Sequence, residues 1–95
     1  MMHPESKGPL FPLGQVVITH GADVALGGLA NAFDLLLRHM SGDDGDLDQE
    51  DKESNQEAIE HGYRILSSYN LPCGTVWIIT EADRASTTIL LPSEY

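Results

Sequence analysis

The chain has 95 residues, which amounts to one small domain with a single hydrophobic core. Its 41% hydrophobic and 21% charged residues are typical of a folded globular protein rather than a disordered one. Fifteen acids against five bases give a net charge of −10. This charge excludes direct binding to nucleic acid or to an anionic membrane as the main activity, because both need a basic surface.

We expect a cytoplasmic protein that needs no cofactor. No apolar run reaches the roughly 20 residues of a membrane span. The first residues lack the basic and then apolar pattern of a signal peptide. The single cysteine, Cys73, excludes an internal disulfide framework and a zinc-thiolate cluster.

The N-terminal segment changes character at Leu13. Three prolines fall within residues 1–12 and predict a flexible lead-in, because proline lacks the amide that a helix or a sheet uses. The β-branched run that follows predicts a strand over Leu13–Thr19. A single domain is therefore expected over residues 13–95.

Apolar residues recur at spacings of three and four from Val24 to Met40, which predicts helix. Gly27-Gly28 lies inside this stretch, and each glycine costs a helix about 1 kcal/mol. We expect a short helical turn capped by Asp23, then a break, then a firmer helix from about Ala30 to His39.

A second helix is predicted over Gln49–His61. Asp48 is placed to cap its first turn, and Gly62 to take the left-handed position that ends it. Only Ala58 and Ile59 give this helix much apolar surface, so we expect it on the outside of the domain.

Three β-rich runs follow, separated by short loops that favour successive hairpins. They predict antiparallel strands at about Tyr63–Tyr69, Thr75–Thr80 and Ser86–Leu91. The fold class is then α+β, an antiparallel meander with the N-terminal strand as a fourth strand and helices covering one face. The expected core consists largely of Leu29, Phe33, Leu36, Leu37, Ile65, Trp77, Ile79, Ile89 and Leu91.

Negative charge is concentrated between Ser41 and Glu60, where nine acids and one base leave −8 of the −10. Acidic runs are often only a solvated surface. The functional alternative is a surface that imitates nucleic acid or docks a basic partner by electrostatic steering. The candidate partner-binding residues are Asp43, Asp44, Asp46, Asp48, Glu50, Asp51, Glu53 and Glu57.

The same acids offer a weaker alternative, a cation site. Read as a calcium-binding loop, the run from Asp44 or from Asp46 lacks the glycine that the sixth position requires. A looser magnesium or calcium site using Asp43, Asp46 and His39 stays open. A pair between His39 and Asp43 alone is a further alternative, but the helix dipole already favours a histidine at this helix end, which is the simpler interpretation.

The hairpin near the C-terminus holds further candidates in Arg84, Thr87 and Thr88. Its polar side chains are sufficient to close a turn, which is the simpler interpretation. Arg84, one of five bases, is expected either to bind an anion or to clamp the acidic loop.

Several stretches carry a more specific pattern: Leu13–Val17, Leu37–His39, Gly42–Leu47, Glu50-Asp51 with Asn55, Gly62–Ser67, Trp77–Arg84 and Thr87–Pro92. With them, the chain from about Leu13 to Tyr95 resembles a family of short bacterial proteins of unknown function, found on plasmids and integrative elements. Asp44 stands where the family pattern carries tryptophan. This departure argues against packing of that loop on an apolar surface.

The resemblance implies a mobile-element context and no activity. In that context small acidic proteins often inhibit host defence, as anti-restriction and anti-CRISPR proteins do, and several imitate DNA. We therefore expect a non-enzymatic interaction protein that binds a basic surface of a host protein, one that itself binds nucleic acid. The alternatives are a small metal-dependent hydrolase using His39, Asp43, Asp46 and Arg84, and a homodimeric regulatory subunit.

Overall fold

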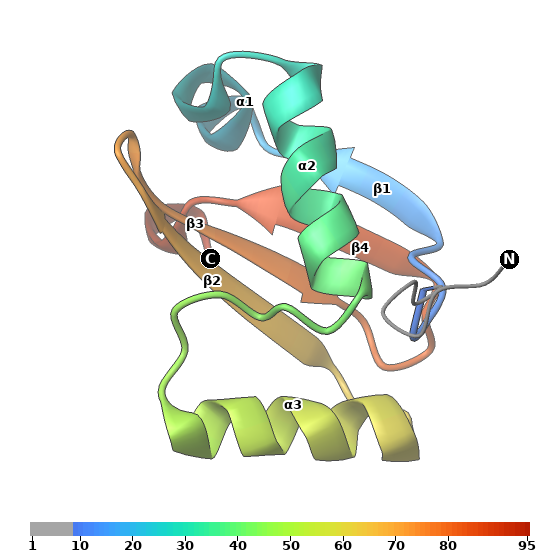
Figure 1. The fold of residues 1–95 in the computed structure, drawn as a ribbon. Helices are drawn as coiled ribbons and strands as arrows, with labels where there is room; N and C mark the ends of the chain where they lie inside the picture. The colour runs from blue at the N-terminus through green and yellow to red at the C-terminus, as the bar shows by residue number, and fades with distance from the viewer. Residues whose placement is uncertain (1–8) are drawn as a thin grey trace, which may run out of the picture.

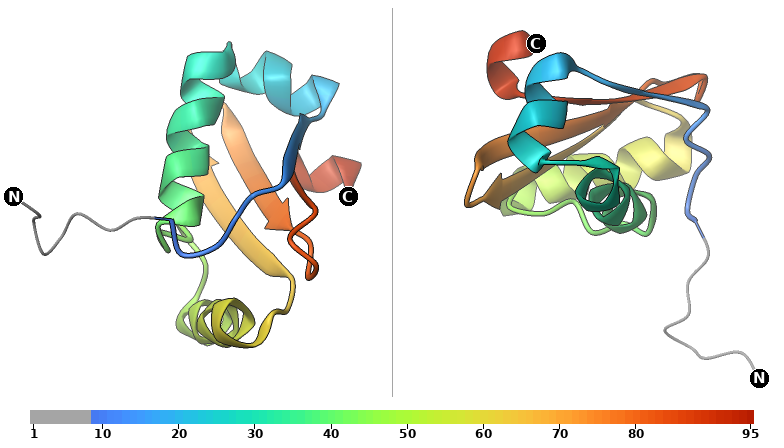
Figure 2. Two further views of the ribbon diagram at one scale, coloured as in Figure 1. Left: turned by 90° about the vertical axis from the view of Figure 1, so that its right-hand side faces the viewer. Right: turned by 90° about the horizontal axis from the view of Figure 1, so that it is seen from above.

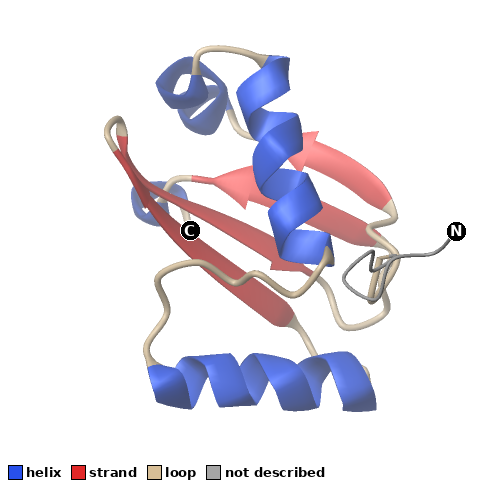
Figure 3. Cartoon of the chain, viewed as in Figure 1, coloured by secondary structure: helices blue, strands red, loops and turns tan. Residues whose placement is uncertain are grey.

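The structure, a computed structural model, describes residues 9–95 of the chain (Figure 1). Its elements in chain order are β1 (Gln15–Ile18), α1 (His20–Leu26), α2 (Leu29–Met40), α3 (Gln49–His61), β2 (Ile65–Leu71), β3 (Gly74–Thr80), β4 (Ser86–Leu90) and the 3-10 turn η1 (Pro92–Glu94). The predicted α+β class is confirmed (Figure 3). No helix within residues 9–95 is long and apolar enough to cross a membrane.

The four strands form one sheet in the order β1-β4-β3-β2. Strands β2, β3 and β4 are the predicted antiparallel meander. β1, however, is shorter than predicted and runs parallel to β4, so the sheet is mixed. The connection from β1 to β4 passes through all three helices and two strands, and such a long connection can return the chain in the parallel sense.

Helices α1 and α2 cover one face of the sheet, and α3 lies beside β2, at the edge opposite β1 (Figures 1 and 2). The main core forms between the first two helices and the inward side chains of the strands, among them Tyr69, Val76, Ile78 and Ile89. The other face carries the C-terminal residues, where Tyr95 meets the edge of Trp77 with ring centroids 5.8 Å apart. Trp77 is therefore only half-buried.

The helix ends follow the local sequence closely. The predicted break at Gly27-Gly28 is confirmed, since Gly27 ends α1 in the left-handed region at φ 73°. Asp48 caps α3 by accepting from the Asp51 amide, and Gly62 ends it at φ 77°, both as predicted. The prediction that Asp23 caps the first helix is wrong: Thr19 does so, because the helix begins four residues earlier than the apolar pattern.

The predicted core is partly wrong. Leu36, Ile65, Ile79 and Ile89 are buried, and Trp77 and Leu91 are half-buried. By contrast, Leu29, Phe33 and Leu37 are 76%, 61% and 47% exposed. Leu29 and Phe33 lie on the flank of α2 toward β1, where the sheet ends before it can cover them.

The flexible lead-in predicted over residues 1–12 can be compared with the structure only from residue 9 onward. Residues 1–8 lie outside the described part of the chain. Phe11, however, is only 5% exposed and packs with Ala58 and Ile65 in a second small cluster. Its ring also meets the edge of His39, with centroids 5.2 Å apart. The packed domain therefore begins before Leu13.

Two adjacent leucines, Leu36 and Leu37, test which side of α2 is buried and which is exposed. Leu36→Ala should lower the free energy of unfolding by about 2 kcal/mol, the lower end for such a truncation, because Leu36 also borders an open groove. Leu37→Ala, the matched control, should cost less than about 1 kcal/mol, since its side chain is half exposed. Urea denaturation of both variants measures the difference, and equal losses would contradict the placement of α2.

Candidate functional site

The acidic segment divides into a loop, residues 41–48, and helix α3. The loop runs along the outer edge of β2. The Asp46 amide donates to the Ser68 carbonyl at 2.7 Å, and the Ser68 amide donates to the Asp44 carbonyl at 3.1 Å. The Asn70 amide donates to Asp46 Oδ2 at 2.8 Å. The loop thus pairs backbone groups that an edge strand otherwise leaves open to other chains.

Asn55 of α3 completes the covering of this edge. Its Oδ1 accepts from the Leu66 amide at 3.1 Å, and its Nδ2 donates to the Leu66 carbonyl. Nδ2 also lies 3.3 Å from Asp44 Oδ2. Because the side chain is only 6% exposed, water reaches these groups poorly. Asn55 thus fastens the middle of α3 to β2.

Asp43 is held by Arg38, not by His39. Arg38 Nε donates to Asp43 Oδ2 at 2.7 Å, and this bond holds the pKa of the Asp43 carboxyl below its usual value. The Tyr69 hydroxyl donates to the Asp43 carbonyl at 2.6 Å, and burial raises the pKa of Tyr69 to about 12. The alternative of a His39–Asp43 pair is wrong, because both ring nitrogens of His39 contact hydroxyl groups in the core.

The acids of α3 are arranged differently from those of the loop. Residues 50, 53, 57 and 60 recur at helical spacing and lie on the side opposite Asn55 and Ala58, the buried residues of this helix. We call these four side chains the glutamate stripe: Glu50, Glu53, Glu57 and Glu60. All four are exposed, and so are Asp51 and the one basic residue, Lys52.

Buried beneath the loop is a polar chain centred on His39, which is 1% exposed. His39 Nδ1 lies 2.6 Å from Ser67 Oγ, and Nε2 lies 2.8 Å from Thr80 Oγ1. Thr80 Oγ1 in turn lies 2.8 Å from Thr87 Oγ1, which donates to the Leu13 carbonyl at 2.8 Å. The chain therefore joins α2, β2, β3, β4 and the segment before β1.

These contacts fix the proton positions. The Thr87 hydroxyl gives its proton to the Leu13 carbonyl, so Thr80 must donate to Thr87. Nε2 of His39 must then donate to Thr80, which leaves Nδ1 to accept from Ser67. A neutral ring satisfies every group in this arrangement. Burial lowers the pKa of His39 to about 4, consistent with the neutral form.

A metal centre at His39, Asp43 and Asp46 finds no support in this geometry. Both ring nitrogens of His39 are occupied by hydroxyl groups inside the core. Asp43 is bound to Arg38, and Asp46 accepts from the Asn70 amide. Within residues 9–95, no three His, Cys, Asp or Glu side chains are grouped so that they could hold a metal ion.

Arg84 stabilises the fold at a different place from the one expected. Its Nη2 donates to the Ala58 carbonyl at 2.9 Å and its Nη1 to the Tyr63 carbonyl at 2.6 Å, so it fastens the C-terminal end of α3 to the β3–β4 turn. It clamps this helix end rather than the acidic loop. Of the two threonines, Thr87 belongs to the buried chain and Thr88 pairs with Val17 in the sheet.

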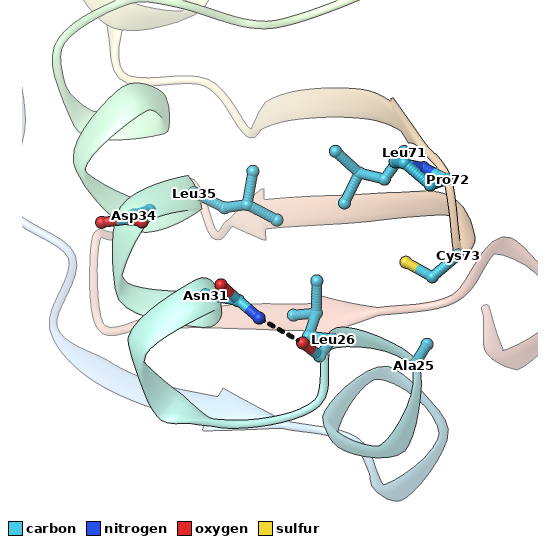
Figure 4. A pocket seen from close by; sticks show the side chains of 8 residues that line it. All are labelled: Ala25, Leu26, Asn31, Asp34, Leu35, Leu71, Pro72 and Cys73. Carbon is cyan, nitrogen blue, oxygen red and sulfur yellow. Dashed lines mark hydrogen bonds between the residues drawn. The ribbon is translucent and has the colours of Figure 1, made fainter.

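Besides a small hollow of about 210 Å³ beside Trp77 and Tyr95, two larger hollows open on the described surface. One, of about 350 Å³, lies between α1, α2 and the β2–β3 turn, where Cys73 faces Leu26 and Asn31 (Figure 4). Its Asn31 amide nitrogen is already bonded to the Leu26 carbonyl, at 2.6 Å. The other, an apolar groove of about 460 Å³, lies between α2 and β1.

Sequence reasoning missed Asn55, Ser67 and Thr80 as structural centres. A signal was present for two of them: Ser67 stands between Ile65 and Tyr69 at an inward position of β2, and Thr80 follows Ile78 at an inward position of β3. Polar residues at inward positions imply a buried polar partner. Nothing local to Asn55 marks it as the cap of an edge strand.

Comparison with known protein families, with curated proteins and with solved structures finds no match for this chain.

Proposed function

We propose that the chain is a non-enzymatic interaction protein whose glutamate stripe binds a basic surface of a host protein. The observation that carries this proposal is the stripe itself, four exposed acids on the side of α3 turned away from the domain. The fold uses α3 through Asn55 and Ala58, and the side-chain hydrogen bond found for the stripe among the described residues lies within the helix, from Gln49 Nε2 to Glu53 Oε2 at 3.3 Å.

Charge spacing indicates the kind of partner. At about 1.5 Å per residue, the ten helical steps from Glu50 to Glu60 span about 15 Å, which places the four charges about 5 Å apart. A strand of B-DNA carries one phosphate charge about every 3.4 Å along its axis. A groove of lysines and arginines that holds a nucleic-acid backbone is therefore a suitable partner, and binding there would exclude the nucleic acid.

Such an inhibitor would act in the bacterial cytoplasm, where restriction and CRISPR complexes meet foreign DNA. The resemblance to proteins of plasmids and integrative elements favours this context. The loop acids Asp43, Asp44, Asp46 and Asp48 add to the negative field. They also cap, pair or orient backbone within the domain, so they are unsuitable as the first residues to neutralise.

Neutralising the stripe should abolish partner capture without unfolding the domain. Exposed charge pairs contribute about 0–1 kcal/mol each, so Glu50, Glu53, Glu57 and Glu60 changed together to Gln should weaken binding about 10- to 100-fold. Capture from a bacterial lysate at low salt, with elution by duplex DNA, identifies the partner by mass spectrometry. Titration of the purified partner then measures the loss.

The matched comparison uses pairs of equal charge. Glu53→Gln with Glu57→Gln should weaken binding, whereas Asp23→Asn with Asp34→Asn, exposed acids on α1 and α2, should change it little. Raising salt from about 0.05 to 0.5 M should imitate the stripe variant, because the screening length falls from about 14 to 4 Å. Capture unaffected by both the stripe variant and salt would refute the proposal.

A further inference from the structure

The apolar groove between α2 and β1 lies at the edge of the sheet away from α3. Val16 and Ile18 of β1, Ile89 of β4, and Leu29 and Phe33 of α2 form much of its wall, and no charged residue lines it. Val16 is 43% exposed, Phe33 61% and Leu29 76%. Large apolar side chains that are this exposed and lie next to one another indicate an interaction surface, whereas single exposed apolar residues are ordinary on a protein surface.

The backbone beside this groove is open as well. The Gln15 amide bonds to the Ala85 carbonyl at 2.9 Å and the Thr19 amide to the Ile89 carbonyl at 3.0 Å. Alternate residues of a strand direct their backbone groups to the same side, so Val16 and Ile18 direct theirs away from β4. Within residues 9–95, nothing pairs with this side of β1.

Helix α2 is apolar over a wider arc than the sheet covers. Its inward side chains, Ala32, Leu35, Leu36 and His39, are buried, while the flank toward β1 continues as Leu29 and Phe33. The sheet ends at β1, and Leu29 and Phe33 of this flank line the groove beside that edge strand. The domain thus has room for one more strand beside β1.

We propose that a second copy of this chain supplies that strand, by antiparallel pairing of the two β1 strands about a two-fold axis at Val17. In this register Val16 of each copy lies opposite Ile18 of the other. The amides and carbonyls of Val16 and Ile18, which face outward in the single copy, then make four hydrogen bonds, and a continuous eight-stranded sheet results.

The distribution of charge favours a second copy over a foreign strand. Each chain carries −10, so association of two copies requires their acidic surfaces to stay apart. The β1 edge meets this requirement, because α3 lies at the opposite edge of the sheet. β1 itself presents Val16 and Ile18 on the helix side, the apolar residues that fit beneath the partner's Phe33. A two-fold contact also closes on itself and forms no filament.

This inference is independent of the proposed function, since the interface and the glutamate stripe share no residue. Light scattering and sedimentation of the full chain between about 1 and 200 μM should show a dimer. Phe33→Glu should raise the dimer dissociation constant about 100-fold or more, because a buried carboxylate has no partner there. Val24→Glu, a control of similar exposure on α1 outside the groove, should leave the dimer intact.

A second variant addresses the strand pairing directly. Val16→Pro removes an amide that faces away from β4, so the monomer keeps its own ladder, and an edge strand tolerates proline. This variant should be monomeric with a melting temperature close to that of the monomeric Phe33→Glu variant. A wild-type chain that stays monomeric at all concentrations, or a dimer that survives both Val16→Pro and Phe33→Glu, would overturn the proposal.

A disulfide cross-link tests the register of the two β1 strands. Opposed, non-hydrogen-bonded residues have Cα atoms about 4.5 Å apart, within disulfide reach. In a chain with the exposed Cys73 changed to Ser, Val17→Cys should therefore form a disulfide-linked dimer when oxidised by copper phenanthroline. Val24→Cys in the same background should stay monomeric on a non-reducing gel. Absence of the Val17→Cys dimer would refute the register.

Discussion

Replacing Asn55 with alanine should lower the free energy of unfolding by about 3 kcal/mol or more. The change leaves the amide and the carbonyl of Leu66 without partners at a site that is mostly closed to water, and each such group costs about 1–3 kcal/mol. Gln56→Ala, at the exposed neighbouring position, should cost less than about 0.5 kcal/mol. Chemical denaturation monitored by Trp77 fluorescence provides the comparison.

Asn55→Asp separates hydrogen bonding from packing. It keeps the shape and the acceptor for the Leu66 amide but places a carboxylate oxygen against the Leu66 carbonyl and Asp44. A protonated carboxyl donates again. The deficit of this variant against the wild type should therefore shrink as pH falls from 7 toward 4. A deficit that does not change with pH would show that Asn55 does not act as a donor to β2.

The sequence predicted what depends on local pattern. Alternating apolar residues and short turns predicted the strands β2, β3 and β4. Apolar residues at spacings of three and four predicted the helix α2. These patterns reflect side-chain direction, which is a property of the element itself. They carry no information on which strands become neighbours or in which direction they run, so the parallel pairing of β1 with β4 was not predicted.

The misplaced core residues have the same origin. Periodicity marks Leu29, Phe33 and Leu37 as one flank of an apolar face, but burial depends on whether a strand lies beneath them. Here the sheet stops at β1. The positions where a sound local prediction fails are therefore the positions that point to a missing strand.

The sequence indicated where the acidic residues of the candidate site are concentrated, but not what each of them does. An excess of acid between Ser41 and Glu60 is visible in the chain, and so is the spacing of the glutamates. What distinguishes the loop acids from the stripe is the edge of β2, a strand more than twenty residues away from Asp43. The division between acids that hold the fold and acids that face solvent needed the tertiary structure.

His39 should make the domain markedly less stable in weak acid. Burial holds its pKa at about 4 in the folded chain, against an ordinary value of 6.5. Between these two values the unfolded chain binds a proton that the folded chain does not. The contribution to stability is therefore complete above pH 6.5 and declines as pH falls toward 4, by about 3 kcal/mol in total, since each pKa unit corresponds to about 1.4 kcal/mol.

Urea denaturation between pH 7 and 5 isolates this effect. Hydrogen bonding lowers the pKa of Asp43 and of Glu94 from ordinary values of 3.8 and 4.5, so their losses come at lower pH. The wild type should lose about 2 kcal/mol over this range.

His39→Phe should be less stable at pH 7, because Ser67 and Thr80 lose their partner, but its stability should change little toward pH 5. The controls His20→Gln and His61→Gln, both at exposed positions, should show the same change of unfolding free energy with pH as the wild type. If His39→Phe also shows this change, the loss of stability in weak acid does not come from His39.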